Sequence, residues 1–191
     1  MLMTFALGAF SQNTLYLPPM EGTPDDDIAP EGWTVAEISP DIIEGNGPWP
    51  MGTYTVADVD GGTVSGKSMG LFLSSDTTIL EGWQTSLTKL KKDESYSFAF
   101  QWQQASLLSG NDIWYQGGEL LVIVDGDSTV FKSKKDVSDD WQIAKIKFKA
   151  KSETANVIIK IHISPNSYAG SYGGAIVVDN VCQECHEAGM W

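Results

Sequence analysis

The feature that most constrains the fold is a strict alternation of aromatic and polar residues near the middle of the chain. From Tyr96 to Gln103 every even position is aromatic and every odd position is small or polar. Successive side chains of a strand point to opposite faces of a sheet, so this pattern predicts a strand with one face in the core. Further alternating or β-branched runs lie at 69–73, 119–124, 141–150, 155–163 and 175–181.

No signal for helices accompanies these runs. No window of a dozen residues combines a helical period with helix caps. The segment 125–127, Asp-Gly-Asp, predicts a tight turn directly after a strand. Nineteen glycines and seven tryptophans are typical of short strands joined by tight turns. The sequence therefore predicts an all-β protein, a two-sheet antiparallel β-sandwich.

The chain divides into three parts by composition. Residues 1–12 hold a short uncharged apolar run followed by polar residues. Ten apolar residues are too few to span a bilayer, which takes about 20, and the run is typical of the end of a signal peptide. A buried first strand is the alternative. We expect a remnant of a signal peptide at 1–12, one domain at 13–182 and a tail at 183–191, in a secreted or cell-surface protein.

The charge balance excludes whole classes of partner. The chain has 25 acidic and 12 basic side chains, a net charge of −13, and every basic residue is a lysine. Nucleic acids and anionic membranes bind surfaces on which cationic side chains are concentrated. We therefore expect no nucleic acid partner, and no apolar run is long enough for membrane insertion.

Six short motifs occur in the order found in jelly-roll carbohydrate-binding modules that bind xylan and β-glucans. They lie at 20–22 (Met-Glu-Gly), 32–34 (Gly-Trp-Thr), 65–69 (Ser-Gly-Lys-Ser-Met), 91–100 (a Lys-rich turn, then Tyr-Ser-Phe-Ala-Phe), Trp141 and 176–181 (Ile-Val-Val-Asp-Asn-Val). The chain resembles this family over about residues 13–182, with Met20 where Phe is usual. The resemblance implies a jelly-roll fold and non-catalytic binding of a polysaccharide or oligosaccharide.

The same resemblance implies a structural calcium site that joins the first and last strands. Glu21 and Asp179 match the acidic positions of that site. Calcium takes six to eight oxygen ligands, partly from backbone carbonyls, so a carboxylate from each end of the chain suits it. The alternative is that both are ordinary surface carboxylates.

Aromatic and amide side chains outside the core pattern are candidate sugar contacts. The flat C–H faces of a sugar stack on aromatic rings, and amides hydrogen-bond its hydroxyls. The candidates are Trp114, Tyr115, Gln101, Gln103, Trp49, Tyr168 and Tyr172. The two glutamines lie opposite the aromatic stripe of their strand and are expected to line a concave sheet. Trp114 and Tyr115 are neighbours, so we expect at least one to face solvent.

A Cys-x-x-Cys-His pattern, Cys182 to His186, lies five residues before the last residue of the sequence. The spacing matches c-type haem attachment. A disulfide, common in exported chains, and an incidental occurrence are the alternatives.

Two other functions stay open beside a binding module. A glycan hydrolase needs two carboxylates about 5–10 Å apart across a cleft, and Glu119 with Asp112 or Asp58 with Asp60 are available. We expect His162 to be a surface or half-buried residue and not a base. No nucleophile-elbow or zinc-protease motif occurs, so we expect no catalysis. The other alternative is a structural or adhesion domain of a cell-surface protein, and a binding module can itself belong to a larger surface protein or enzyme.

Overall fold

The computed structural model describes residues 13–49, 54–59, 67–75, 80–132, 141–164 and 170–180. These residues form strands, turns and loops without a helix, which confirms the all-β prediction. Accordingly, no helix in the described part of the chain could cross a membrane. The signal-peptide segment, Tyr168 and the Cys182–His186 pattern lie outside the described residues, so those predictions and the domain bounds stay predictions.

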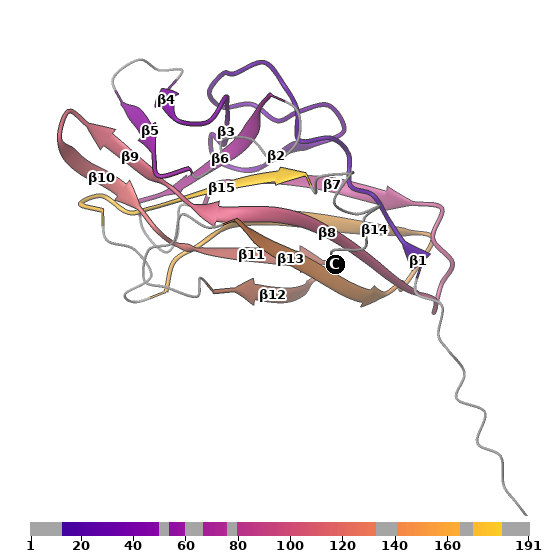
Figure 1. Cartoon of the computed structure of the whole chain (residues 1–191). Helices are drawn as coiled ribbons and strands as arrows, with labels where there is room; N and C mark the ends of the chain where they lie inside the picture. The colour runs from indigo at the N-terminus through magenta and orange to yellow at the C-terminus, as the bar shows by residue number, and fades with distance from the viewer. Residues whose placement is uncertain are drawn as a thin grey trace, which may run out of the picture.

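The strands lie in three sheets (Figure 1). Sheet A contains β1 (Asn13–Thr14), β3 (Asp41–Ile43), β6 (Met69–Ser74), β8 (Ser95–Gln104), β13 (Gln142–Lys149) and β15 (Gly174–Asn180). Sheet B contains β2 (Thr34–Glu37), β7 (Gly82–Thr88), β11 (Glu119–Val124), β12 (Asp127–Phe131) and β14 (Thr154–His162). Sheet C contains β4 (Gly47–Pro48), β5 (Thr55–Ala57), β9 (Ser106–Ser109) and β10 (Asp112–Gln116).

Sheets A and B form the predicted antiparallel sandwich. The strand order of sheet A is β1-β8-β15-β6-β3, and β13 also pairs with β8. The strand order of sheet B is β12-β11-β14-β7-β2. The even-numbered side chains of β8 are buried, as the alternation predicts, and they pack with Trp83, Val122 and Ile159 of sheet B. Only the short pair of β1 with β8 is parallel among the described strands.

Sheet C covers part of the outer face of sheet A and encloses a second core. Leu71 and Val177 from sheet A pack there with Val56 and Leu107 from sheet C. The strand β9 follows β8 after a single residue, Ala105, and the chain changes sheets at this point. The alternation gives no signal of that change, because both sheets continue the same period of two. Sheet C is a third sheet in addition to the predicted antiparallel sandwich of sheets A and B.

The segment around Met20 meets the end of β15, an inner strand of sheet A. The backbone N–H of Met20 donates a hydrogen bond to Asn180 Oδ1, and Asn180 Nδ2 donates to the carbonyl of Pro18 at 3.4 Å. The first and last segments of the sandwich are therefore joined directly.

Candidate functional site

The hairpin of β9 and β10 presents its aromatic residues through a register shift. The two strands pair regularly from Asp112 to Ile113 and again from Tyr115, and the shift falls at Trp114. A bulge of this kind bends a strand and redirects a side chain. Trp114 thus leaves the pairing pattern of its strand and turns towards other aromatic rings.

Those rings form a continuous row, which we call the aromatic row: Trp49, Tyr54, Trp114, Tyr172 and Tyr115. Neighbouring ring centroids lie 5.3 Å apart for Trp49 and Tyr54, and 5.1 Å apart for Tyr54 and Trp114. Trp114 and Tyr172 stack at 4.2 Å with 31° between their planes, and Tyr115 lies 6.2 Å from Tyr172. Each contact joins rings within the distance at which aromatic pairs attract, so the row supports itself.

The segment 170–173 holds Tyr172 against β10. Tyr172 N–H donates to the carbonyl of Trp114 at 2.7 Å, and Gln116 N–H donates to that of Gly173 at 2.9 Å. Gly170 has no room for a side chain, since an added Cβ would lie 2.5 Å from the carbonyl oxygen of Trp114. This close approach of two backbones fixes the Trp114–Tyr172 stack.

The row has one buried side and one open side. Trp49, Tyr54 and Tyr115 are half-buried and pack against the second core, whereas Tyr172 is 50% exposed. The row is thus held on one side by the second core, and Tyr172 leaves it accessible to solvent on the other side. A surface of this kind offers rigid apolar area that loses little conformational entropy when a ligand binds.

The structure brings together four of the seven predicted sugar contacts: Trp49, Trp114, Tyr115 and Tyr172. Tyr54 was missed, although the sequence Trp-Pro-Met-Gly-Thr-Tyr at 49–54 places two aromatics around a turn signal. The backbone N–H of Trp49 donates to the carbonyl of Tyr54 at 2.9 Å, which sets the two rings side by side.

The two glutamines do not line an open concave face, contrary to the expectation. Gln103 lies opposite Val177 in the pairing of β8 with β15, and it is fully buried because sheet C covers this face. Gln101 is half-buried, and its Oε1 atom is buried without a hydrogen-bond partner. The alternation assigns these residues to the correct face of β8, but it carries no information on what covers that face.

Two buried carboxyl groups lie next to the row. Asp41 accepts a hydrogen bond from Trp49 Nε1 at 2.8 Å, and burial raises the pKa of Asp41 to about 7. Glu81 accepts from the backbone N–H of Leu73 at 2.6 Å, and burial, reinforced by the charge of Asp41, raises its pKa to about 9. Burial, together with the nearby Tyr54 and Glu81, also raises the pKa of Tyr115. Sequence reasoning found neither acid, because an apolar strand with one Asp gives no sign of burial.

The predicted calcium ligands lie where the chain ends meet. Glu21 Oε2 accepts hydrogen bonds from the backbone of Lys67 at 3.1 Å and from Ser68 Oγ at 3.2 Å, while Oε1 is buried without a partner. Asp179 is fully buried, and its neighbour Asn180 holds Met20. A buried, unpartnered carboxylate oxygen fits a bound cation. The described residues hold no group of three or more His, Cys, Asp or Glu that could bind a metal, so a calcium ion here would need further oxygen ligands.

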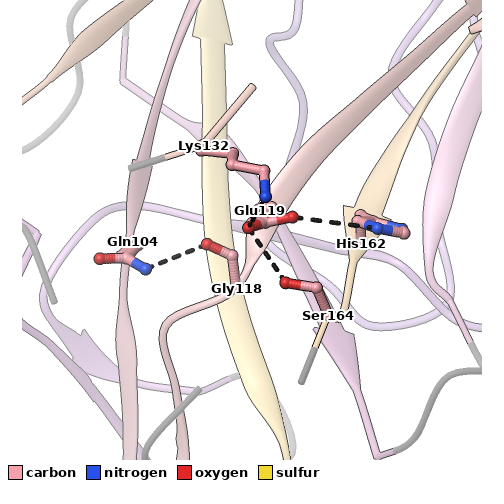
Figure 2. A network of polar contacts seen from close by, with 6 residues as sticks. All are labelled: Gln104, Gly118, Glu119, Lys132, His162 and Ser164. Carbon is pink, nitrogen blue, oxygen red and sulfur yellow. Dashed lines mark hydrogen bonds and ion pairs between the residues drawn. The ribbon is translucent and has the colours of Figure 1, made fainter. Parts of the chain in front are cut away.

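Glu119 forms a separate polar network at the end of β11 (Figure 2). Ser164 Oγ donates to Glu119 Oε1 at 3.1 Å, and Lys132 Nζ lies 3.7 Å from the same oxygen. His162 Nε2 lies 3.9 Å from Oε2, and this histidine is half-buried, as predicted. In the same view Gln104 Nε2 donates to the carbonyl of Gly118 at 3.0 Å. The network ties the ends of β11 and β14 together.

The carboxylates suggested for a hydrolase lie in different surroundings. Glu119 is buried in its network, whereas Asp112 and Asp58 are exposed, and Asp60 lies outside the described residues. A groove of about 510 Å³ at the edge between β12 and β13 contains Asp93 and Asp127. Each of these is paired with a lysine, Lys149 at 3.1 Å and Lys151 at 2.9 Å. Both carboxylates of the groove are therefore held in ion pairs with lysines.

The chain is similar to known proteins in its three-dimensional structure, and the two sequence comparisons found no match. No protein-family model matches the sequence, and no curated protein sequence matches it. The structure is similar to that of TmCBM61 in complex with β-1,4-galactotriose, with 9% identity, a TM-score of 0.45, and coverage of 78% of this chain and 86% of that one. It is also similar to the CBM22-1 xylan-binding domain from Paenibacillus barcinonensis Xyn10C, with 14% identity, a TM-score of 0.45, and coverage of 89% and 94%.

Proposed function

We propose that the chain is a non-catalytic module that binds neutral polysaccharide through the aromatic row. The observation that carries the proposal is the row itself, with five rings in contact, anchored on one side and open on the other. Sugar rings present flat C–H faces that stack on such surfaces, and tyrosine hydroxyls at the row supply hydrogen bonds. The motif order of the sequence supports the same conclusion.

The charge of the protein supports a neutral ligand. A net charge of −13 repels an anionic polymer over most of the surface, and the row itself contains no lysine. The wider proposal is a secreted or cell-surface protein, or an accessory module of a larger surface protein or enzyme. The ligand would then be an extracellular glycan.

We further propose that calcium stabilises the sandwich through Glu21 and Asp179. The unpartnered Oε1 of Glu21 and the direct contact between the chain ends support this site. A bound ion at this junction would resist separation of the first and last segments.

The test of polysaccharide binding is affinity electrophoresis in gels that contain xylan, mixed-linkage β-glucan or galactan. We expect retardation of the wild type in at least one gel, and loss of retardation for Trp114→Ala. The matched control is Tyr16→Ala, which removes an aromatic that is 73% exposed near β1, at the other end of the sandwich in Figure 1. Equal mobility of the wild type in all gels and in plain gel would contradict the proposal.

The calcium site is tested by thermal melting with calcium and with chelator. A ligand bound only to the native state stabilises it by about 2.7 kcal/mol when present at 100 times its dissociation constant. We expect the melting midpoint to fall by about 5–11 °C on chelation, at about 2–4 °C per kcal/mol for a domain of this size. Glu21→Gln should melt at the chelated midpoint under both conditions. A wild-type midpoint that chelation leaves unchanged would remove calcium from the account.

A further inference from the structure

Trp49 is held in the aromatic row at two points. Its backbone N–H donates to the carbonyl of Tyr54 at 2.9 Å, and its indole N–H donates to Asp41 Oδ2 at 2.8 Å. The first bond fixes the backbone, whereas the second fixes the rotation of the ring. Asp41 is therefore the group that sets the plane of the indole.

Asp41 itself is rigidly placed. It is the first residue of β3, which pairs with β6 in sheet A, and it is 1% exposed. Its second oxygen, Oδ1, accepts from the backbone N–H of Asp27 at 3.3 Å. Both oxygens of the carboxyl group thus accept hydrogen bonds, one from the loop between β1 and β2 and one from the ring.

The orientation of the Trp49 ring affects the packing of the neighbouring rings of the row. Its ring packs on Tyr54 at 5.3 Å, and Tyr54 packs on Trp114 at 5.1 Å. A rotated indole would remove the support of Tyr54 on one side. The orientation of the indole at this end of the row therefore depends on the hydrogen bond between Trp49 and Asp41, in addition to its packing.

We infer that Asp41 is a positioning residue for sugar binding, which orients Trp49 so that the row presents one continuous surface to a polysaccharide chain. The inference rests on the proposed function. Asp41 touches no ligand in this account and acts through the indole alone. A carboxyl group kept in a buried site against the cost of desolvation is consistent with such a role.

A double-mutant cycle tests the inference, with Asp41→Ala, Trp49→Phe and the double variant. Trp49→Phe keeps an aromatic ring but removes the N–H donor. We expect each single variant to lower the affinity for the retarding polysaccharide about tenfold, because the indole loses the hydrogen bond that orients it. The double variant should bind as weakly as Trp49→Phe alone, because Asp41 has no ring N–H left to hold.

Two further variants separate positioning from general stabilisation. Asp41→Asn retains an acceptor oxygen and should keep the affinity within about threefold. Glu119→Gln alters another buried carboxyl group, whose partners are Ser164 and Lys132 and not a ring of the row, and should leave the affinity unchanged. Near-UV circular dichroism confirms that each variant is folded. Should Asp41→Ala fail to fold, Trp49→Phe and Asp41→Asn still give opposite expected results.

The outcomes distinguish this inference from the proposed function. Full affinity in Trp49→Phe, or an Asp41→Ala loss that persists unchanged in the Trp49→Phe background, overturns the positioning role while polysaccharide binding stands. A wild type that binds no polysaccharide overturns both.

Discussion

The two outer faces of the sandwich differ in what lies on them. The outer face of sheet B carries the half-buried aliphatic residues Leu121, Ile123 and Ile158, and Lys160 forms an ion pair with Glu37 at 2.7 Å. The outer face of sheet A is partly covered by sheet C, and the aromatic row is built from the β4–β5 pair and β10 of that sheet together with Tyr172. Both faces come from the same alternation. A binding surface arises only where further chain folds over the sheet and collects aromatic residues that are distant in sequence.

The largest loss of polysaccharide affinity is expected when two rings of the aromatic row are removed. The matched control removes two aliphatic side chains from the outer face of sheet B. The double variant Trp114→Ala/Tyr172→Ala should lose at least about 30-fold in polysaccharide affinity, the effect of one binding hot spot. Leu121→Ala/Ile158→Ala, on sheet B, should bind as the wild type does. Isothermal titration calorimetry with an oligosaccharide measures both. Weaker binding by the sheet B variant would reverse the assignment of the two faces.

The next effect is expected at the backbone contact that supports the Trp114–Tyr172 stack. Gly170→Ala places a Cβ against the carbonyl oxygen of Trp114 and should cost about 1–3 kcal/mol of unfolding free energy, with about a tenfold loss of affinity. Its control is Gly126→Ala in the β11–β12 turn, where nothing lies within 4 Å of an added Cβ. Strain from its φ of 87° should cost about 1–2 kcal/mol and no affinity. Equal affinity losses in the two variants would mean that the row is insensitive to its support.

The buried acids beside the row predict a dependence of stability on pH. Asp41 and Glu81 have pKa values raised from 3.8 to about 7 and from 4.5 to about 9, so the folded state binds their protons more tightly than the unfolded state does. Their contribution is full below about pH 4 and is lost as the pH rises towards 9, by about 1 kcal/mol per pH unit for each proton. Urea unfolding at pH 5 and pH 8 should show a smaller difference in Asp41→Asn/Glu81→Gln than in the wild type. An unchanged difference would mean that neither acid is responsible.

The smallest effect is expected from a single hydroxyl on the open side of the row. Tyr172→Phe keeps the ring that stacks on Trp114 and should lower the affinity by less than about threefold. The measurement is calorimetry with the same oligosaccharide. A loss as large as that of Trp114→Ala would show that hydrogen bonding, and not stacking, dominates recognition.

The strands were predictable because they follow a local rule. The period of two identified β8 and the burial of its Phe98, Phe100 and Trp102, which need only neighbouring residues to recognise. Four members of the row were also predictable, since aromatic residues in turn-rich segments stand out from the core pattern. Their mutual contact was not, because it depends on sheet C and on the pairing of 170–173 with β10.

The remaining features depend on tertiary contacts that leave no local signal. The burial of Gln103 follows from the cover that sheet C gives to sheet A, and that of Asp41 from Asp27 and Trp49, which cover the start of the edge strand β3. Tyr54 joins the row because its carbonyl accepts a hydrogen bond from the backbone N–H of Trp49. Of these two aromatic residues, the sequence predicted only Trp49 as a sugar contact. A sequence shows which residues could serve a site, but the contacts decide which of them do.

The central claim is that a sugar chain lies on the aromatic row. Its most direct test is an NMR titration that follows the indole N–H signals, assigned by single Trp→Phe variants, while a binding oligosaccharide is added. The account predicts shifts for Trp114 and Trp49 and unchanged signals for Trp33 and Trp83, which are buried in the main core. Saturable shifts at backbone signals of Leu121, Ile158 and His162, with Trp114 and Trp49 unmoved, would contradict it.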